Sequence, residues 1–165
     1  MSTKIKHGPM YEVGQISGAN RNLKDVCQKF PEAKYVADAH ESIKILVRDQ
    51  DIRQSTAGDH TNCAMAVACR HQLRATGAHI GMNTSYLVFG KLLLRFQTPE
   101  SVRREIVSFD RNDDFRKGAF GLSRIIPSNR LFRQRRCKRG PHKTKAKASK
   151  RLVFRGSTMG VRTTN

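Results

Sequence analysis

The residues best placed to do chemistry form a basic run near the C-terminus. Residues 133–150 read Arg-Gln-Arg-Arg-Cys-Lys-Arg-Gly-Pro-His-Lys-Thr-Lys-Ala-Lys-Ala-Ser-Lys. Cationic groups at this density neutralise successive phosphates and release their counterions. The planar guanidinium fork of arginine also suits phosphate oxygens and stacks on exposed bases. The run therefore predicts electrostatic binding to a phosphate-bearing polymer.

The candidate binding residues share a positive charge and a position after residue 115. The centre of the predicted site is Arg133, Arg135, Arg136, Lys138 and Arg139. The wider set is Arg116, Lys117, Arg124, Arg130, Lys143, Lys145, Lys147, Lys150, Arg151 and Arg155.

The position of the charged residues along the sequence is more informative about function than the net charge of the chain. The chain of 165 residues carries a net charge of +19. Residues 1–114 hold 16 Lys or Arg and all 13 acidic residues, for a net charge of +3, whereas residues 115–165 hold 16 Lys or Arg and no acid. So large an uncompensated charge repels itself in a compact state, which indicates a polyanionic partner.

A membrane is a weaker candidate for that partner. The longest apolar runs are far too short to cross a bilayer, and no amphipathic helix with a bulky apolar face accompanies the cations. RNA is favoured over DNA, because the sequence has no zinc-finger spacing, no leucine zipper and no clear helix-turn-helix. Chains that mix Arg and Lys with Gly, Pro, Ser and Thr thread readily along irregular RNA.

Zinc binding is a second chemistry to weigh, because His60, Cys63, Cys69 and His71 lie close in the sequence. Structural zinc sites usually pair their cysteines in a C-x-x-C knuckle, which this chain lacks. Cys63 and Cys69 are six residues apart on one predicted helix and face different ways. We expect small buried thiols here, with no metal and no cofactor.

A metal-dependent nuclease is a third possibility, carried by Asp110, Asp113 and Asp114. Such a cluster could bind Mg²⁺. The more ordinary interpretation is a polar turn that closes a helix, with the acids paired to Arg111, Arg116 or Lys117. The sequence has no G-x-S-x-G, Walker A or H-E-x-x-H motif. We therefore expect a protein that is not an enzyme.

The elements that must position these residues follow from apolar periodicity. Alternation over residues 42–47 predicts a half-buried strand. Residues 61–74 predict a mostly buried helix capped by Thr61 or Asn62, with Gly77 just past its end. Residues 86–89 and 92–96 flank Gly90-Lys91, which indicates a tight hairpin. A helix begins near Pro99 and ends near Asp110.

The order of these elements, strand, helix, hairpin and helix, predicts an α+β fold with two or three helices on one face of a small antiparallel sheet. A strand near residues 80–82, a strand over 11–16 and a short helix over 22–30 are also expected. Three parts follow: a partly packed N-terminal extension over 1–41, a compact α+β domain over 42–122, and an extended basic nucleic-acid-binding tail over 123–165. Apolar residues between 115 and 132 should dock on the domain.

The segment from Asp59 through Cys63 to Ala68, together with the later Phe109-Asp110, resembles a set of short uncharacterised bacterial and phage proteins. That set has a D-x-x-x-C-P-V-A-x-A-L helix start followed later by F-D. The resemblance covers about residues 42–122 and departs at Ala64, which replaces the proline of the motif. It implies the same order of elements and a viral origin, and it implies no chemistry.

The sequence thus favours a non-enzymatic nucleic-acid-binding protein, as a structural or accessory component of a ribonucleoprotein or virion. The α+β domain would supply contacts to other protein subunits. A small capsid or coat subunit that assembles around its genome is the first alternative, and the nuclease is the second. The N-terminus has no apolar signal segment, so we expect the protein in the cytoplasm or within a virus particle.

Overall fold

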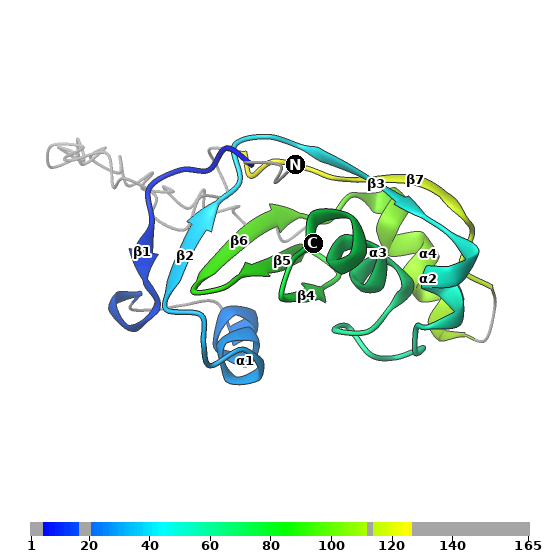
Figure 1. Ribbon diagram of the computed structural model, residues 1–165, viewed down its shortest axis with the longest axis horizontal. Coiled ribbons are helices and arrows are strands. Elements are labelled where there is room, and N and C mark those ends of the chain that lie inside the picture. Colours follow the sequence, from blue (N-terminus) through cyan, green and yellow to red (C-terminus); the bar gives the residue numbers. More distant parts are fainter. Residues whose placement is uncertain (1–4, 17–20, 112–113, 127–165) are drawn as a thin grey trace, which may run out of the picture. The chain divides into compact units, whose positions relative to one another are not determined.

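The computed structural model describes residues 5–16, 21–111 and 114–126 (Figure 1). Its helices are α1 (Arg21–Lys29), α2 (Asp49–Arg53), α3 (Ala64–Leu73), α4 (Glu100–Asp110) and the 3-10 turn Val13–Gln15. Its strands are β1 (Tyr11–Glu12), β2 (Tyr35–Asp38), β3 (Ile43–Val47), β4 (Gly77–Ile80), β5 (Thr84–Phe89), β6 (Leu92–Gln97) and β7 (Gly118–Leu122).

The central sheet has five strands in the order β1-β2-β6-β5-β4. Neighbouring strands are antiparallel except β2 and β6, which run parallel. The predicted hairpin is confirmed: Phe89 pairs with Leu92 across the turn, and Gly90 supplies the positive φ, +60°, that a two-residue turn needs.

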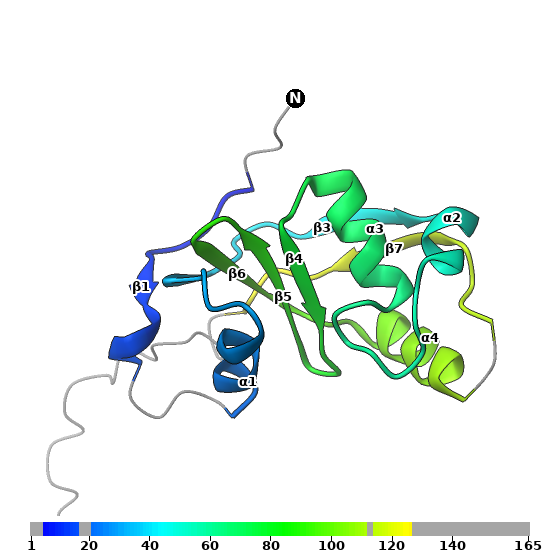
Figure 2. The same cartoon turned by 60° about the horizontal axis from the view of Figure 1, so that its bottom comes forward.

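Both faces of this sheet are buried. Along β5, Leu87 faces a core built with α3 and α4, whereas Tyr86 and Val88 face a second core built with Leu23 and Val26 of α1. Because side chains alternate along a strand, adjacent residues contribute to different cores. Figure 2 shows α1 and α3 on opposite sides of the sheet.

Helix α3 packs closely on the sheet, because every residue from Ala64 to Cys69 is buried and most of these side chains are small. The predicted buried helix is therefore confirmed, and its predicted end at Arg74 agrees with the structure, but the predicted cap at Thr61 or Asn62 is wrong. Cys63 is the N-cap residue, and Arg74 takes the left-handed conformation at the C-cap with φ +55°. Gly77 instead belongs to β4, where a Cβ would lie 2.4 Å from the ring of Phe30.

Strands β3 and β7 form a separate two-stranded ribbon. Ile45 and Leu122 point from it into the core that α3 and α4 share with the sheet. After β7 the chain returns to the central sheet, where the backbone N–H groups and carbonyls of Ser123 and Gln97 exchange hydrogen bonds. The predicted strand over 42–47 is confirmed. Docking of the apolar residues after 115 is confirmed for Leu122 and Ile125, which are buried, but not for Ile126, which is 43% exposed.

The α+β class is confirmed, and the structure refines its details. The predicted all-antiparallel sheet contains one parallel pair, and the predicted single helical face becomes two, because α1 covers the side that α3 and α4 leave open. The predicted N-terminal extension over 1–41 contributes β1, α1 and β2, so the compact part includes residues before 42. The predicted strand over 11–16 shortens to β1 and a 3-10 turn.

Candidate nucleic-acid interface

Three of the predicted binding residues, Arg116, Lys117 and Arg124, lie in the described part of the chain, and all three are exposed. They flank β7, with two before the strand and one after it. Six residues of extended chain lie between Lys117 and Arg124, which places them on the order of 20 Å apart. The ribbon therefore presents these cations in a row and does not gather them into one pocket.

The backbone around these cations is anchored to the protein. The N–H of Arg116 donates to the Glu105 carboxylate at 3.1 Å, and the N–H of Arg124 donates to the Ser42 hydroxyl at 3.0 Å. Both anchors use main-chain groups, which leaves the two guanidinium groups to the solvent.

Lys117 is the one of the three with an ion pair among the described residues. Its Nζ lies 3.3 Å from Asp49 Oδ2, with both side chains more than half exposed. An exposed pair of this kind contributes at most about 1 kcal/mol, so a phosphate can replace the carboxylate.

The other twelve predicted binding residues lie outside the described residues. They are Arg130, Arg133, Arg135, Arg136, Lys138, Arg139, Lys143, Lys145, Lys147, Lys150, Arg151 and Arg155.

A second cationic feature, which is not among the predicted binding residues, lies on α4. A groove of about 450 Å³ runs along one face of this helix beside the β4–β5 turn. We call it the α4 groove, and its lining residues are Met82, Glu100, Arg103, Arg104, Val107, Ser108 and Arg111. The five α4 positions and the C-cap residue Arg111 form a single stripe, because their spacings repeat with the helical period.

The α4 groove has a surplus of positive charge, since three arginines face one carboxylate. Arg104 pairs with that carboxylate, Glu100. The Nε atom of Arg103 is buried and has no hydrogen-bond partner among the described residues. Val102, Ile106 and Phe109 form a separate, apolar stripe of this helix, which packs into the core. The spacing of the arginines in the sequence was the one signal that could have pointed to this cationic stripe.

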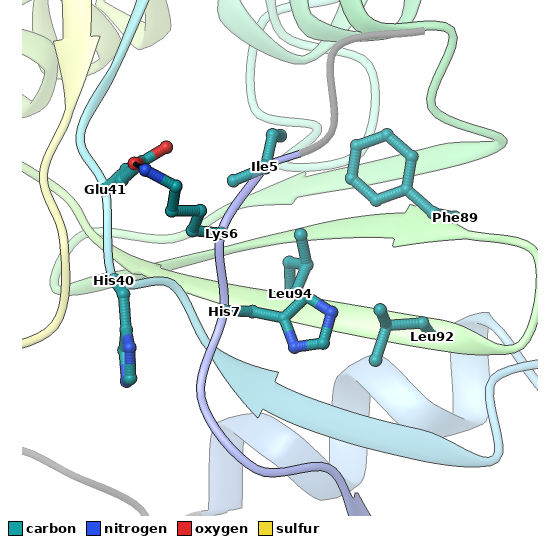
Figure 3. A pocket seen from close by; sticks show the side chains of 8 residues that line it. All are labelled: Ile5, Lys6, His7, His40, Glu41, Phe89, Leu92 and Leu94. Atoms are coloured by element: carbon teal, nitrogen blue, oxygen red, sulfur yellow. Dashed lines mark ion pairs between the residues drawn. The ribbon is translucent and has the colours of Figure 1, made fainter.

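A larger hollow of about 710 Å³ lies elsewhere, between the N-terminal segment and the sheet (Figure 3). Its floor is apolar and its rim is polar: Ile5, Lys6, His7, His40, Glu41, Phe89, Leu92 and Leu94 line it. Lys6 Nζ and Glu41 Oε1 pair at 2.8 Å, a contact that raises the pKa of the lysine and lowers the pKa of the glutamate. With its one lysine paired, this hollow has no surplus charge for a phosphate backbone.

The residues weighed for zinc do not converge. Cys63 and Cys69 are buried thiols, and burial raises the pKa of Cys63 to about 11 and the pKa of Cys69 further still. His71 Nδ1 instead contacts Asp51 Oδ1 at 2.7 Å, and His60 packs edge-on against His79. Within residues 5–16, 21–111 and 114–126, no group of three or more His, Cys, Asp or Glu is arranged to hold a metal ion.

The acids weighed for a nuclease are only partly described. Asp110 Oδ1 accepts a hydrogen bond from the backbone N–H of Gly58 at 2.7 Å, so it joins α4 to the loop before α3. Asp114 is exposed, and Asp113 lies outside the described residues. The described part thus gives Asp110 a structural contact and shows no converging acids.

No helix in the described ranges has both the length and the apolar character needed to cross a bilayer. Comparison of the chain with models of known families, with curated proteins and with solved structures gives no match. The candidate interface therefore rests on the residues of this chain alone.

Proposed function

We propose that this chain is a non-enzymatic nucleic-acid-binding protein whose C-terminal basic segment lies along phosphates. The observation that carries the proposal is the charge of residues 115–165, which hold 16 Lys or Arg and no carboxylate. No acidic side chain within that segment can neutralise it. A polymer of phosphates can, and the counterions it releases then favour binding.

Features of the described part support this assignment. The first cations of the segment, Arg116 and Arg124, have exposed side chains on a backbone anchored to the domain. The α4 groove adds a further positive surface to the domain. RNA remains favoured over DNA, with a structural or accessory role in a ribonucleoprotein or virion, and with protein contacts through the α+β domain.

The deciding experiment measures how binding depends on salt. Fluorescence anisotropy with a labelled 20-nucleotide RNA would compare the natural chain with a tail variant in which Arg133, Arg135, Arg136, Lys138 and Arg139 are all glutamine. Each lost contact to a single strand lowers the slope of log K against log salt by about 0.7, so the slope should fall by about 3 if most of the five contacts are made. A matched variant with lysine at the same five positions keeps the charge and should keep the slope. Unchanged affinity and slope in the glutamine variant would overturn the proposal.

A further inference from the structure

We propose that the α4 groove is a second nucleic-acid site, which takes the phosphodiester backbone of a single strand and one of its bases. This inference rests on the proposed function for the identity of the ligand. It concerns a different surface, made by the domain and not by the C-terminal segment. Its chemistry, guanidinium toward phosphate, is shared by RNA and DNA.

The length and charge of the groove fit an extended strand. Arg103 and the C-cap residue Arg111 are eight positions apart, about 12 Å along the axis of α4. That span accommodates more than one phosphate of an extended chain. Arginine presents its N–H groups in a planar fork that binds two phosphate oxygens at once, so a row of arginines along α4 can follow a backbone.

The state of Arg103 points independently to a ligand. Its Nε is buried and has no hydrogen-bond partner among the described residues, although the side chain lines the groove. A buried donor without a partner is uncommon in native proteins. If the guanidinium of Arg103 turns toward the groove, a phosphate oxygen there can provide the missing acceptor. Arg104, by contrast, is already paired with Glu100, and that exposed pair can open to a phosphate.

The apolar wall of the groove favours a single strand over a duplex. Met82 is 39% exposed at the β4–β5 turn, and Val107 lines the groove beside it. A single strand offers unstacked bases that can pack against such side chains, whereas a duplex keeps its bases stacked inside. Thioether side chains adapt to flat rings of different shape, so we expect little preference among bases.

The test uses the full chain and three variants that replace charged residues by glutamine. The groove variant is Arg103→Gln/Arg104→Gln/Arg111→Gln. Its matched control, Lys24→Gln/Lys34→Gln/Lys44→Gln, removes the same charge from exposed positions elsewhere on the domain. A second variant, Arg104→Gln/Arg111→Gln, changes only exposed residues and replaces the first if that variant fails to fold. Affinities for single-stranded RNA, single-stranded DNA and duplex DNA are compared at one salt concentration.

The groove variant should bind both single strands roughly 10-fold to 100-fold more weakly, as expected for the loss of one or two charge-assisted hydrogen bonds. The Lys24→Gln/Lys34→Gln/Lys44→Gln control should bind with nearly the affinity of the natural chain. A cross-linking measurement shows where the RNA lies on the chain. Photoreactive RNA should label the tryptic peptide 75–91, which contains Met82, in the natural chain and not in the groove variant.

The possible failures are distinguishable. The groove variant could bind as tightly as the Lys24→Gln/Lys34→Gln/Lys44→Gln control while the tail variant loses affinity. In that case the α4 groove is not a binding site, and the proposed function stands. If the groove variant loses affinity while the tail variant does not, the tail assignment is wrong and the groove stands. Equal losses for duplex and single strand would overturn the single-strand inference. If polyglutamate competes more strongly than an oligonucleotide, the ligand of the groove is not a nucleic acid. If the chain binds no nucleic acid at all, both proposals are wrong.

Discussion

Arg95 Nε donates a hydrogen bond to Asp38 Oδ1 over 2.6 Å, and both side chains are about nine-tenths buried. The two residues are register partners on β2 and β6, the parallel pair of the central sheet. The turn of an antiparallel hairpin sets the register of its two strands, but two parallel strands are not joined by a tight turn that could do so. The ion pair therefore fixes how the N-terminal segment joins the hairpin.

The first prediction concerns this pair. Asp38→Ala leaves the Arg95 charge buried without its carboxylate, and we expect a loss of about 3–5 kcal/mol in the free energy of unfolding. Asp38→Leu/Arg95→Met removes both charges at similar volume and should cost much less. Urea denaturation of the single and double variants measures this. A double variant as unstable as the sum of its single variants would contradict the coupling.

The second prediction concerns Gly77, which lies on β4 against α1. A Cβ there would come within 2.4 Å of the Phe30 ring, so Gly77→Ala must displace that ring or the strand. We expect destabilisation of about 1–3 kcal/mol, typical of overpacking. Gly14→Ala is the control, since no atom lies within 4 Å of the added methyl group. Gly77→Ala/Phe30→Leu should recover part of the loss in thermal denaturation.

The sequence predicted the elements whose apolar pattern is regular. Strand β3 alternates, α4 has an apolar stripe at Val102 and Ile106, and both were found where expected. Strand β2 was missed because Val36, Ala37 and Asp38 are all buried in a sheet covered on both faces, so the strand has no alternation to detect. The end of α3 was found within one residue of its predicted place, but its start was set one or two residues early, at Thr61 or Asn62 instead of Cys63. Gly77 lies just past the helix as predicted, yet it is required by the Phe30 ring and not by a helix terminus.

The candidate site was predictable only in part. The charge contrast after residue 115 is visible in the sequence, but most of its residues lie outside the described ranges. The α4 groove depends on a tertiary contact that no local pattern contains, because Met82 comes from the β4–β5 turn and the arginines come from α4. Only the arginine spacing on the helix could be read in advance.

The third prediction concerns the edge of the ribbon. The Gln72 side chain of α3 accepts a hydrogen bond from the Leu46 N–H at 3.0 Å and donates one to the Leu46 carbonyl at 2.6 Å. It thus occupies the edge of β3 as a neighbouring strand would. Gln72→Glu keeps the shape but sets an oxygen against the carbonyl, and we expect a loss of about 1 kcal/mol. Hydrogen exchange at the Leu46 amide should accelerate, while Gln50→Ala on α2 should leave it unchanged.

The fourth prediction concerns pH and the His79 ring, which packs beside Tyr86. Burial, with help from the charges of Lys29 and His60, lowers the pKa of His79 from 6.5 to about 4. Its Nδ1 atom and the Tyr86 hydroxyl are both buried without a hydrogen-bond partner among the described residues. The folded protein therefore holds this imidazole neutral under conditions that protonate it in the unfolded chain.

The sign of the effect follows from that difference. Above pH 6.5 neither state protonates His79, so the residue makes no contribution to the pH dependence. As the pH falls from 6.5 to 4, only the unfolded chain takes up the proton, and stability is lost across this window. We expect a loss of roughly 1–2 kcal/mol, since each pKa unit corresponds to about 1.4 kcal/mol and partial exposure of the ring reduces the effect. His79→Gln removes the titration, so urea denaturation at pH 7.5, 5.5 and 4.5 should show a smaller decline for the variant. Parallel declines in the two proteins would mean that His79 is protonated as readily in the folded state as in the unfolded chain.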